Sequence, residues 1–209
     1  MSSSPSSKIT EVQGDLFDAP DGAALIHACN CQGSWGKGIA EAFKKKYPAA
    51  FKIYRTHCQN YLKNKQFLTT ETVNTGETQQ QKNTRKIQLP IGTALIIPPQ
   101  EEDYKGDHRK KRHWIICLFT SRGFGRSVSP PAVILQNTAL AVADTKTQLE
   151  KLRSQPDNKD PANIPLGELR SCRFNSGLFG VDWKLSREVL EEAGLEVTVV
   201  RPQGEPLGL

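Results

Sequence analysis

The chain has 209 residues, of which 37% are hydrophobic and 24% charged, and its formal net charge is +6. That length suits one α/β domain that buries roughly 70% of the surface of the unfolded chain. No apolar run approaches the ~20 residues that cross a bilayer, so we expect no membrane contact. Five cysteines without a repeated CxxC pair argue against a disulfide scaffold. The polar segment 1–7 predicts a disordered tail rather than a secretion signal, so we expect a cytoplasmic or nuclear protein.

The first strand is predicted at residues 8–13 (KITEVQ), where apolar and polar side chains alternate. Gly14, Asp15 and Leu16 lead the chain out of this strand. As a purely structural residue, Asp15 is expected to cap a turn by accepting a backbone N–H.

The segment 24–40 (ALIHACNCQGSWGKGIA) organises the rest of the sequence. A buried strand at 23–28 leads into a loop with three glycines, and a helix follows and ends at Tyr47, before a proline. Glycine allows close approach of the backbone to a ligand, and a helix start offers unpaired N–H groups and a positive dipole end to an anion. The segment is neither a Walker loop nor a dinucleotide-binding G-x-G-x-x-G. It indicates a loop for phosphate or ribose, with a glycine-rich connection that binds nothing as the alternative.

His27, Cys29 and Cys31 in the same segment raise the question of a zinc site. Residues two apart on an extended strand point the same way, but no second CxxC or HxxxH pair completes four ligands. We therefore expect buried or loop thiols and no bound metal.

The middle of the chain is more polar. A helix is predicted at 49–62 and a short buried strand at 92–98, whereas 66–90 indicates a mobile loop or an irregular hairpin. Basic residues gather at 44–46 and 108–113. They are either solvated surface or an attraction for phosphate-rich ligands such as RNA.

A near-continuous apolar run at 113–120 predicts a central strand that is covered on both faces. The loop 121–129 (SRGFGRSVS) follows it, and a long helix opens at Pro130–Pro131 and runs through Arg153.

A second glycine-rich segment, 175–183 (NSGLFGVDW), lies between a predicted strand at 168–174 and a predicted helix at 184–193, and a last strand is expected at 195–200. Two such loops suit a ligand with phosphates and sugars, because backbone amides wrap a diphosphate while a ring covers a ribose. The repeated β–α units predict a largely parallel sheet with ligand loops at the carboxyl ends of its strands.

Three motifs, Gly14-Asp15-Leu16, the 27–40 loop and the 177–180 loop, resemble in order and spacing those of the macrodomain, the ADP-ribose-binding module. The strings are most similar to those of the fungal ADP-ribose 1″-phosphate phosphatase branch. The resemblance implies an α/β fold, a three-layer α/β/α macrodomain with a mixed, largely parallel central sheet. It would span residues 8–201, with loop insertions near 66–90, 99–112 and 154–167 and a C-terminal tail at 202–209.

The resemblance also implies where ADP-ribose would lie. Asp15 and Leu16 would hold adenine, and Asn30 would bind the distal ribose. The distal ribose and phosphate would run along Gly36, Lys37, Gly38 and Ile39. The diphosphate would be wrapped by Ser176, Gly177, Leu178, Phe179, Gly180 and Val181, with Phe179 over the distal ribose. The 121–129 loop, which begins at Ser121, would line the ligand site, with a flexible turn as an equal alternative.

Phosphomonoester hydrolysis needs a nucleophile or activated water and stabilisation of charge on the phosphoryl oxygens. His27 is either an acid or base or a hydrogen-bonded core residue. Asp182 stands where the fungal pattern has proline, and is either a base or the cap of the next helix. Lys37 either reaches the terminal phosphate or points into solvent. We predict that Asn30 makes the direct contact and that His27 orients it, or a water, from beneath.

Three functions follow from the resemblance. The leading one is a phosphatase that converts ADP-ribose 1″-phosphate to ADP-ribose and phosphate, without a cofactor and as a monomer. The alternatives are a hydrolase that removes ADP-ribose from modified protein or nucleic acid, and a non-catalytic ADP-ribose reader.

Overall fold

A computed structural model describes residues 8–64, 66–72, 81–87, 89–106, 109–154 and 164–204 of the chain. The expected tail at 1–7, residues 155–163 of the expected 154–167 loop, and residues 205–209 of the C-terminal tail lie outside these residues.

The core of the fold is a six-stranded sheet in the order β1-β8-β7-β2-β6-β5. Its strands are β1 (Ile9–Gln13), β2 (Ala24–Asn30), β5 (Ala94–Ile97), β6 (Trp114–Ser121), β7 (Leu169–Ser171) and β8 (Val197–Arg201). The edge strand β5 runs antiparallel to β6, and every other neighbouring pair is parallel. All residues of β6 are buried, as expected of a central strand in a largely parallel sheet. The mixed, largely parallel sheet that the resemblance implies is confirmed.

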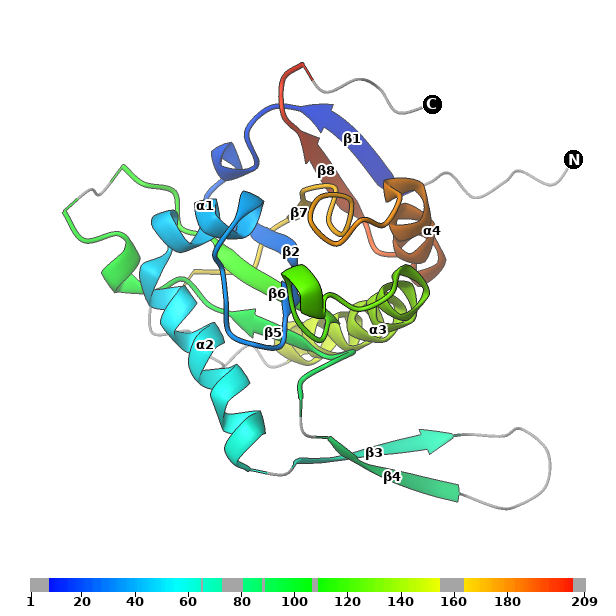
Figure 1. Ribbon diagram of the computed structural model, residues 1–209. Coiled ribbons are helices and arrows are strands. Elements are labelled where there is room, and N and C mark those ends of the chain that lie inside the picture. Colours follow the sequence, from blue (N-terminus) through cyan, green and yellow to red (C-terminus); the bar gives the residue numbers. More distant parts are fainter. Residues whose placement is uncertain are drawn as a thin grey trace, which may run out of the picture.

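Helices cover both faces of this sheet (Figure 1). They are α1 (Gly38–Lys46), α2 (Pro48–Lys63), α3 (Pro131–Ser154) and α4 (Trp183–Ala193), with short 3-10 turns η1 (Leu16–Asp18), η2 (Glu101–Asp103) and η3 (Gly125–Ser127). Leu25 and Cys29 of β2 pack in the core under α1 and α2, whereas Ile26 packs in the core under α3 and α4. The alternation along β2 therefore separates two cores, and the α/β/α architecture is confirmed. No described helix is both long and apolar enough to cross a membrane.

The predicted strands shift by up to two residues at most ends, and two boundaries beside the glycine-rich loops differ in ways that matter for the site. β2 continues to Asn30, and its pairing with β6 shifts register between Cys29 and Asn30. β7 has three residues, whereas the sequence indicated a strand at 168–174. The chain turns soon after β7, because the N–H of Phe174 bonds to the carbonyl of Cys172 and Asn175 takes a left-handed conformation with φ of 66°.

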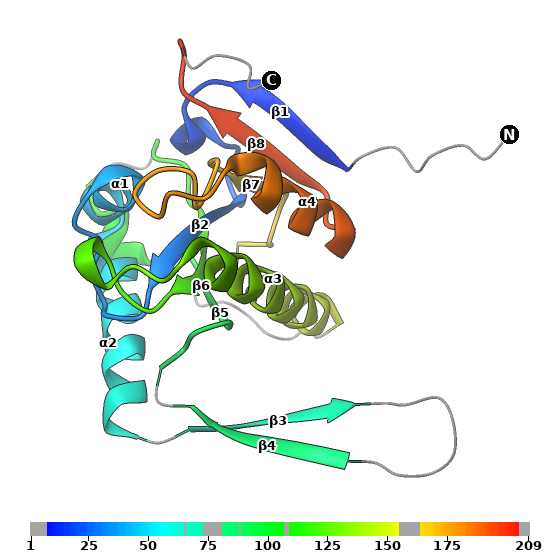
Figure 2. The ribbon, with the colours of Figure 1, turned by 45° about the vertical axis from the view of Figure 1, so that its right-hand side comes forward.

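Residues 66–90, expected as a loop or irregular hairpin, contain two strands, β3 (Gln66–Thr72) and β4 (Gln81–Ile87). They pair antiparallel in continuous register from Gln66 opposite Ile87 to Thr72 opposite Gln81. This hairpin is a separate two-stranded sheet and extends away from the domain in both views (Figures 1 and 2). The hairpin alternative is therefore the one adopted over these strands.

Candidate functional site

Three connections meet where the parallel strands β2, β6 and β7 end (Figure 2). A Cβ placed on Gly38, in the first glycine-rich segment, would lie 3.8 Å from Cδ1 of Leu178 in the second. A Cβ on Gly123, in the loop after β6, would lie 3.1 Å from the side-chain Nε2 of Gln32. The structure thus brings together both segments singled out in the sequence, at the edge where open α/β sheets bind ligands.

The first segment ends at the amino terminus of α1. Lys37 is the N-cap residue, is exposed, and its side chain makes no capping hydrogen bond. Gly36, Gly38 and Ile39 are exposed beside it. Gly38 has φ of +59°, a conformation that favours glycine. The first N–H groups of this helix therefore lack a side-chain partner from their N-cap, and the helix dipole makes this end attractive to an anion.

The second segment presents Ser176, Gly177 and Leu178 to solvent, and Leu178 is 68% exposed. Among the described residues, a Cβ on Gly177 would have no atom within 4 Å apart from its chain neighbours, which leaves open space on this side of the loop. Gly180 has φ of +65°, a backbone conformation that favours glycine and strains most other residues. The loop is closed by its own bonds, since the N–H of Gly180 donates to Gly177 and that of Val181 donates to Asn175.

Asn175, at the start of this loop, is a residue that sequence reasoning did not single out. Its buried side-chain amide accepts a hydrogen bond from Oγ1 of Thr120 at 2.9 Å. It donates to Oγ1 of Thr138 at 3.0 Å and to Oγ of Ser186 at 3.1 Å. One side chain therefore ties the loop to β6, α3 and α4. The sequence does contain one signal for this role, an asparagine directly before Ser-Gly. Asparagine tolerates the left-handed backbone conformation that such a tight turn uses.

Asn30 holds the first loop in shape. Its Nδ2 donates to the carbonyl of Ser34 at 2.6 Å, and its Oδ1 accepts from the backbone N–H of Gln32 at 3.0 Å. The hydroxyl of Tyr54 donates to the Asn30 carbonyl at 2.6 Å. Asn30 is only 6% exposed. Its described contacts are those of a residue that positions the loop, and its contact with ribose stays a prediction.

Ser121 has a similar supporting place. It is completely buried, and its hydroxyl donates to the carbonyl of Gly123 and accepts from the N–H of Ser129. These bonds fold the loop after β6 back on itself, and both its lining of the ligand site and the flexible-turn alternative stay predictions. The large apolar side chain that this loop exposes is Phe124.

Asp15 and Leu16 lie on the turn after β1. Asp15 is exposed and its Oδ1 accepts the N–H of Phe17 at 2.9 Å, which caps η1. The capping interpretation is confirmed, and adenine recognition by the same carboxylate stays a prediction. The Leu16 side chain is buried in the core, so a contact with adenine would fall to its backbone.

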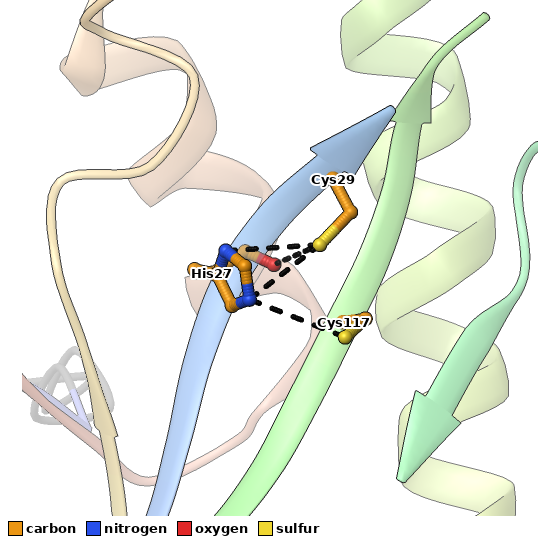
Figure 3. Close-up of side chains that lie close together, drawn as sticks. All are labelled: His27, Cys29 and Cys117. Carbon is orange, nitrogen blue, oxygen red and sulfur yellow. Dashed lines mark hydrogen bonds between the residues drawn. The ribbon is translucent and has the colours of Figure 1, made fainter. Parts of the chain in front are cut away.

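His27 lies on β2 beside Cys29 and opposite Cys117 of β6 (Figure 3). It is in the core beneath α1. Its ring is fully buried, stacks on Phe43 at 4.1 Å between centroids, and meets Trp35 edge-on at 4.9 Å. Its side-chain neighbours also include Cys29 and Cys117. These are the surroundings of a core histidine, the alternative to an acid or base at the ligand. Burial also raises the pKa of the Cys29 thiol well above its ordinary value, which argues against a thiolate nucleophile there.

Asp182 is the N-cap of α4. Its exposed carboxylate accepts the N–H of Lys184 at 2.9 Å. The capping interpretation is confirmed, and a role as base stays a prediction.

An ion network fastens the second loop to β1. Glu11 accepts hydrogen bonds from Arg173 and from Nε1 of Trp183, both at 2.8 Å, and Arg187 and Arg201 lie within 3.6 Å of it. Burial alone would raise the pKa of Glu11, but the hydrogen bonds from Trp183 and Arg173 and the charges of the arginines outweigh it and hold the pKa below its usual range. Because Arg173 precedes the loop and Trp183 follows it, both ends of the loop are anchored to one carboxylate.

The fold and its two convergent loops define the class of this protein, and the comparisons agree. A family model described as "Macro domain" matches residues 26–83. The chain superimposes on the "Macrodomain of Mycobacterium tuberculosis DarG" with a TM-score of 0.61 at 20% identity, over 93% of this chain and 98% of that one. The chain belongs to the macrodomain family.

Curated relatives are similar over nearly the whole length. The chain is 65% identical to the "ADP-ribose 1″-phosphate phosphatase" of Aspergillus clavatus, over 94% of this chain and 95% of that protein. It is 62% identical to the protein of the same name from Aspergillus fumigatus, over 95% of this chain and 96% of that protein.

Proposed function

We propose that this protein is a phosphatase that hydrolyses ADP-ribose 1″-phosphate to ADP-ribose and inorganic phosphate, acting as a monomer. The observation that carries the proposal is the identity of 62–65% with proteins of that name over almost the full length of the chain. The geometry supports it, because the two glycine-rich loops lie against each other at the carboxyl edge of the sheet.

Several features of the described surface support this ligand. The amino terminus of α1, with Lys37 exposed beside it, suits the terminal phosphate. The open side of Gly177 suits the diphosphate, and the half-buried Phe179 suits the distal ribose. Asp15 keeps one carboxylate oxygen for the adenine amino group while the other caps η1.

The reaction breaks the bond between phosphorus and the oxygen on C1″ of the distal ribose. Water supplies the new oxygen on phosphorus, and the departing ribose oxygen takes up a proton. The chain's contribution is to hold the phosphoryl oxygens against the start of α1 and to position the water through the loop that Asn30 holds in shape.

The experiment offers the protein three substrates in parallel: ADP-ribose 1″-phosphate, an ADP-ribosylated protein and an ADP-ribosylated oligonucleotide. We expect free phosphate from the first and no released ADP-ribose from the other two. Release of ADP-ribose from a modified protein or nucleic acid, without phosphate from the first substrate, would identify the ADP-ribosyl hydrolase. Binding of ADP-ribose in calorimetry with no turnover of any substrate would identify the reader.

A further inference from the structure

A cluster of three potential metal ligands lies on β2 and β6 (Figure 3). It belongs to the core under α1. His27 and Cys29 are two residues apart on β2 and point to the same face. Cys117 on β6 is the register partner of His27. All three side chains are buried, with at most 2% of each exposed.

The sequence alone suggested Cys31 as the third member of such a cluster, and the structure supplies Cys117 instead. Cys117 is 90 residues from His27 in the chain, and only the parallel pairing of β2 with β6 brings the two together. The sequence argument against a metal site rested on the spacing of ligands along the chain. It therefore does not apply to His27, Cys29 and Cys117, which the fold brings together.

The nitrogen–sulfur distances are close to those around a coordinated ion. The Nε2 of His27 lies 3.5 Å from Sγ of Cys29 and 4.0 Å from Sγ of Cys117. One ligand atom from each residue fits within 4.8 Å of the other two. A tetrahedral ion with bonds of about 2.3 Å to sulfur and about 2.0–2.1 Å to nitrogen places those two ligand atoms about 3.6 Å apart. To close on one ion, Cys117 would have to move toward the His27 ring. The two sulfur atoms, which lie within 4.8 Å of each other, would have to come to about 3.8 Å.

The imidazole provides an independent argument. His27 is completely buried, and in the part of the chain that the structure describes, the hydrogen-bonding partners of its two ring nitrogens are sulfur atoms. Sulfur is a weak partner, and buried polar groups ordinarily have strong ones. Coordination would give the ring a strong partner. Two thiolates neutralise Zn²⁺, and one thiolate with one neutral thiol neutralises Cu⁺, so either ion would leave the apolar core without a net charge.

We propose that His27, Cys29 and Cys117 bind one thiophilic metal ion, Zn²⁺ or Cu⁺, in the core between β2, β6 and α1. Soft thiolate ligands with imidazole select these ions over Mg²⁺ or Ca²⁺. The ion would tie the two central strands together directly beneath the loop that Asn30 shapes. The site is separate from the phosphate-binding loops, so it does not depend on the proposed phosphatase activity.

The test measures metal content. Chelator-treated protein is supplied with Zn²⁺, with Cu⁺ under reducing conditions, or with Mg²⁺, once in the folded state and once during refolding, because a buried site loads most readily as the chain folds. After desalting, we expect about one equivalent of Zn²⁺ or Cu⁺ per chain and no retained Mg²⁺. Retention of one of the two thiophilic ions but not the other identifies the ion.

Variants then assign the site. Cys29→Ala and Cys117→Ala should lose the bound ion. The matched control Cys58→Ala, which removes another buried thiol outside the cluster, should keep it. Failure of the wild-type protein to retain either ion in both loading protocols would overturn the proposal, and so would retention by a folded Cys117→Ala protein.

A second measurement needs no variant, in case the cysteine substitutions prevent folding. Co²⁺ bound to thiolates gives a ligand-to-metal charge-transfer band in the near ultraviolet. We expect this band in the wild-type protein, and Zn²⁺ should abolish it by competition. Bound Co²⁺ without the band would show that the ion lies elsewhere and would contradict the assignment.

Discussion

At the scale of single residues, Asp15 combines a structural bond with a proposed recognition bond. Asp15→Ala should weaken ADP-ribose binding by about 1.5–3 kcal/mol, because a charge-assisted hydrogen bond to adenine is lost. Asp15→Asn keeps a side-chain oxygen to cap Phe17, so it should retain wild-type stability and show a smaller loss of affinity. Calorimetry and thermal unfolding measure both effects. Unchanged affinity of Asp15→Ala for ADP-ribose would show that Asp15 does not recognise adenine.

Asn30 is the residue on which we expect turnover to depend most. Asn30→Ala should reduce phosphate release from ADP-ribose 1″-phosphate about a hundredfold or more, the scale for losing a positioning or charge-stabilising group. Its side chain holds the backbone of Gln32 and Ser34, so the loss acts through loop geometry as well as through any direct contact.

Two companion variants separate those contributions. Tyr54→Phe removes the bond to the Asn30 carbonyl and a longer one, at 3.3 Å, to Asn30 Oδ1. It leaves the Asn30 side chain's bonds to Gln32 and Ser34, so it should lower turnover much less. His27→Ala should lower turnover with a smaller effect on ADP-ribose binding. Wild-type phosphate release by Asn30→Ala would eliminate the assignment, and Asp182 or Lys37 would then be tested next.

At the scale of elements, the loop between β7 and α4 depends on Gly180. Gly180→Val places a branched side chain at φ of +65° and should both strain the loop and abolish tight ADP-ribose binding. Gly177→Ala has room for its Cβ in the protein and an ordinary backbone, so it should fold normally and lose affinity by blocking the diphosphate path.

Gly194→Val is the matched control for strain. Gly194 has φ of +67° at the end of α4, with no atom within 4 Å of its Cβ position, and it lies outside both glycine-rich loops. Gly194→Val should lower the stability of the fold about as much as Gly180→Val does. It should leave the affinity for ADP-ribose unchanged. Normal ADP-ribose binding by a folded Gly180→Val protein would show that this loop does not cradle the phosphates.

The elements of this domain were largely predictable because their signals are local. The apolar run that forms β6, the proline that ends α1 and begins α2, and the glycines of both loops each act within a few residues. What the sequence did not reveal depends on partners far apart in the chain. Asn175 bonds to Thr120 and Thr138, and His27 meets Cys117, only after the sheet has formed.

The candidate site was predictable in position but less so in the roles of its residues. The sequence located Asn30 and Ser121 at strand ends, yet gave no sign that their side chains are used inside their own loops. A side chain's hydrogen-bond partners depend on loop conformation, which no short-range pattern specifies. The hairpin of β3 and β4 was ambiguous for a related reason, because a polar stretch lacks the apolar alternation that identifies a strand.

At the scale of the whole molecule, Glu11 links stability to pH. The pKa of this carboxylate is lower in the folded protein than in the unfolded chain, so its contribution to stability is full above the unfolded value, about 4.3, and is lost as pH falls through the lowered folded value. Glu11→Gln should therefore reduce the free energy of unfolding by about 2 kcal/mol at pH 7, and the difference from wild type should shrink in acid.

Urea unfolding at several pH values between neutral and strongly acidic conditions measures this difference. Glu41→Gln is the control, because Glu41 pairs with Lys45 on the exposed face of α1 and should leave stability nearly unchanged. If the difference in free energy of unfolding between wild type and Glu11→Gln stays constant in acid, the network of arginines does not stabilise the ionised carboxylate.

The central claim is that this macrodomain recognises ADP-ribose and removes its terminal phosphate. The most direct measurement is phosphate release by the wild-type protein from ADP-ribose 1″-phosphate, beside p-nitrophenyl phosphate, which lacks the ADP-ribose portion. We expect release from the first substrate only, inhibited by added ADP-ribose and lost in Gly180→Val but not in Gly194→Val. No phosphate from ADP-ribose 1″-phosphate by a protein that still binds ADP-ribose would contradict the claim.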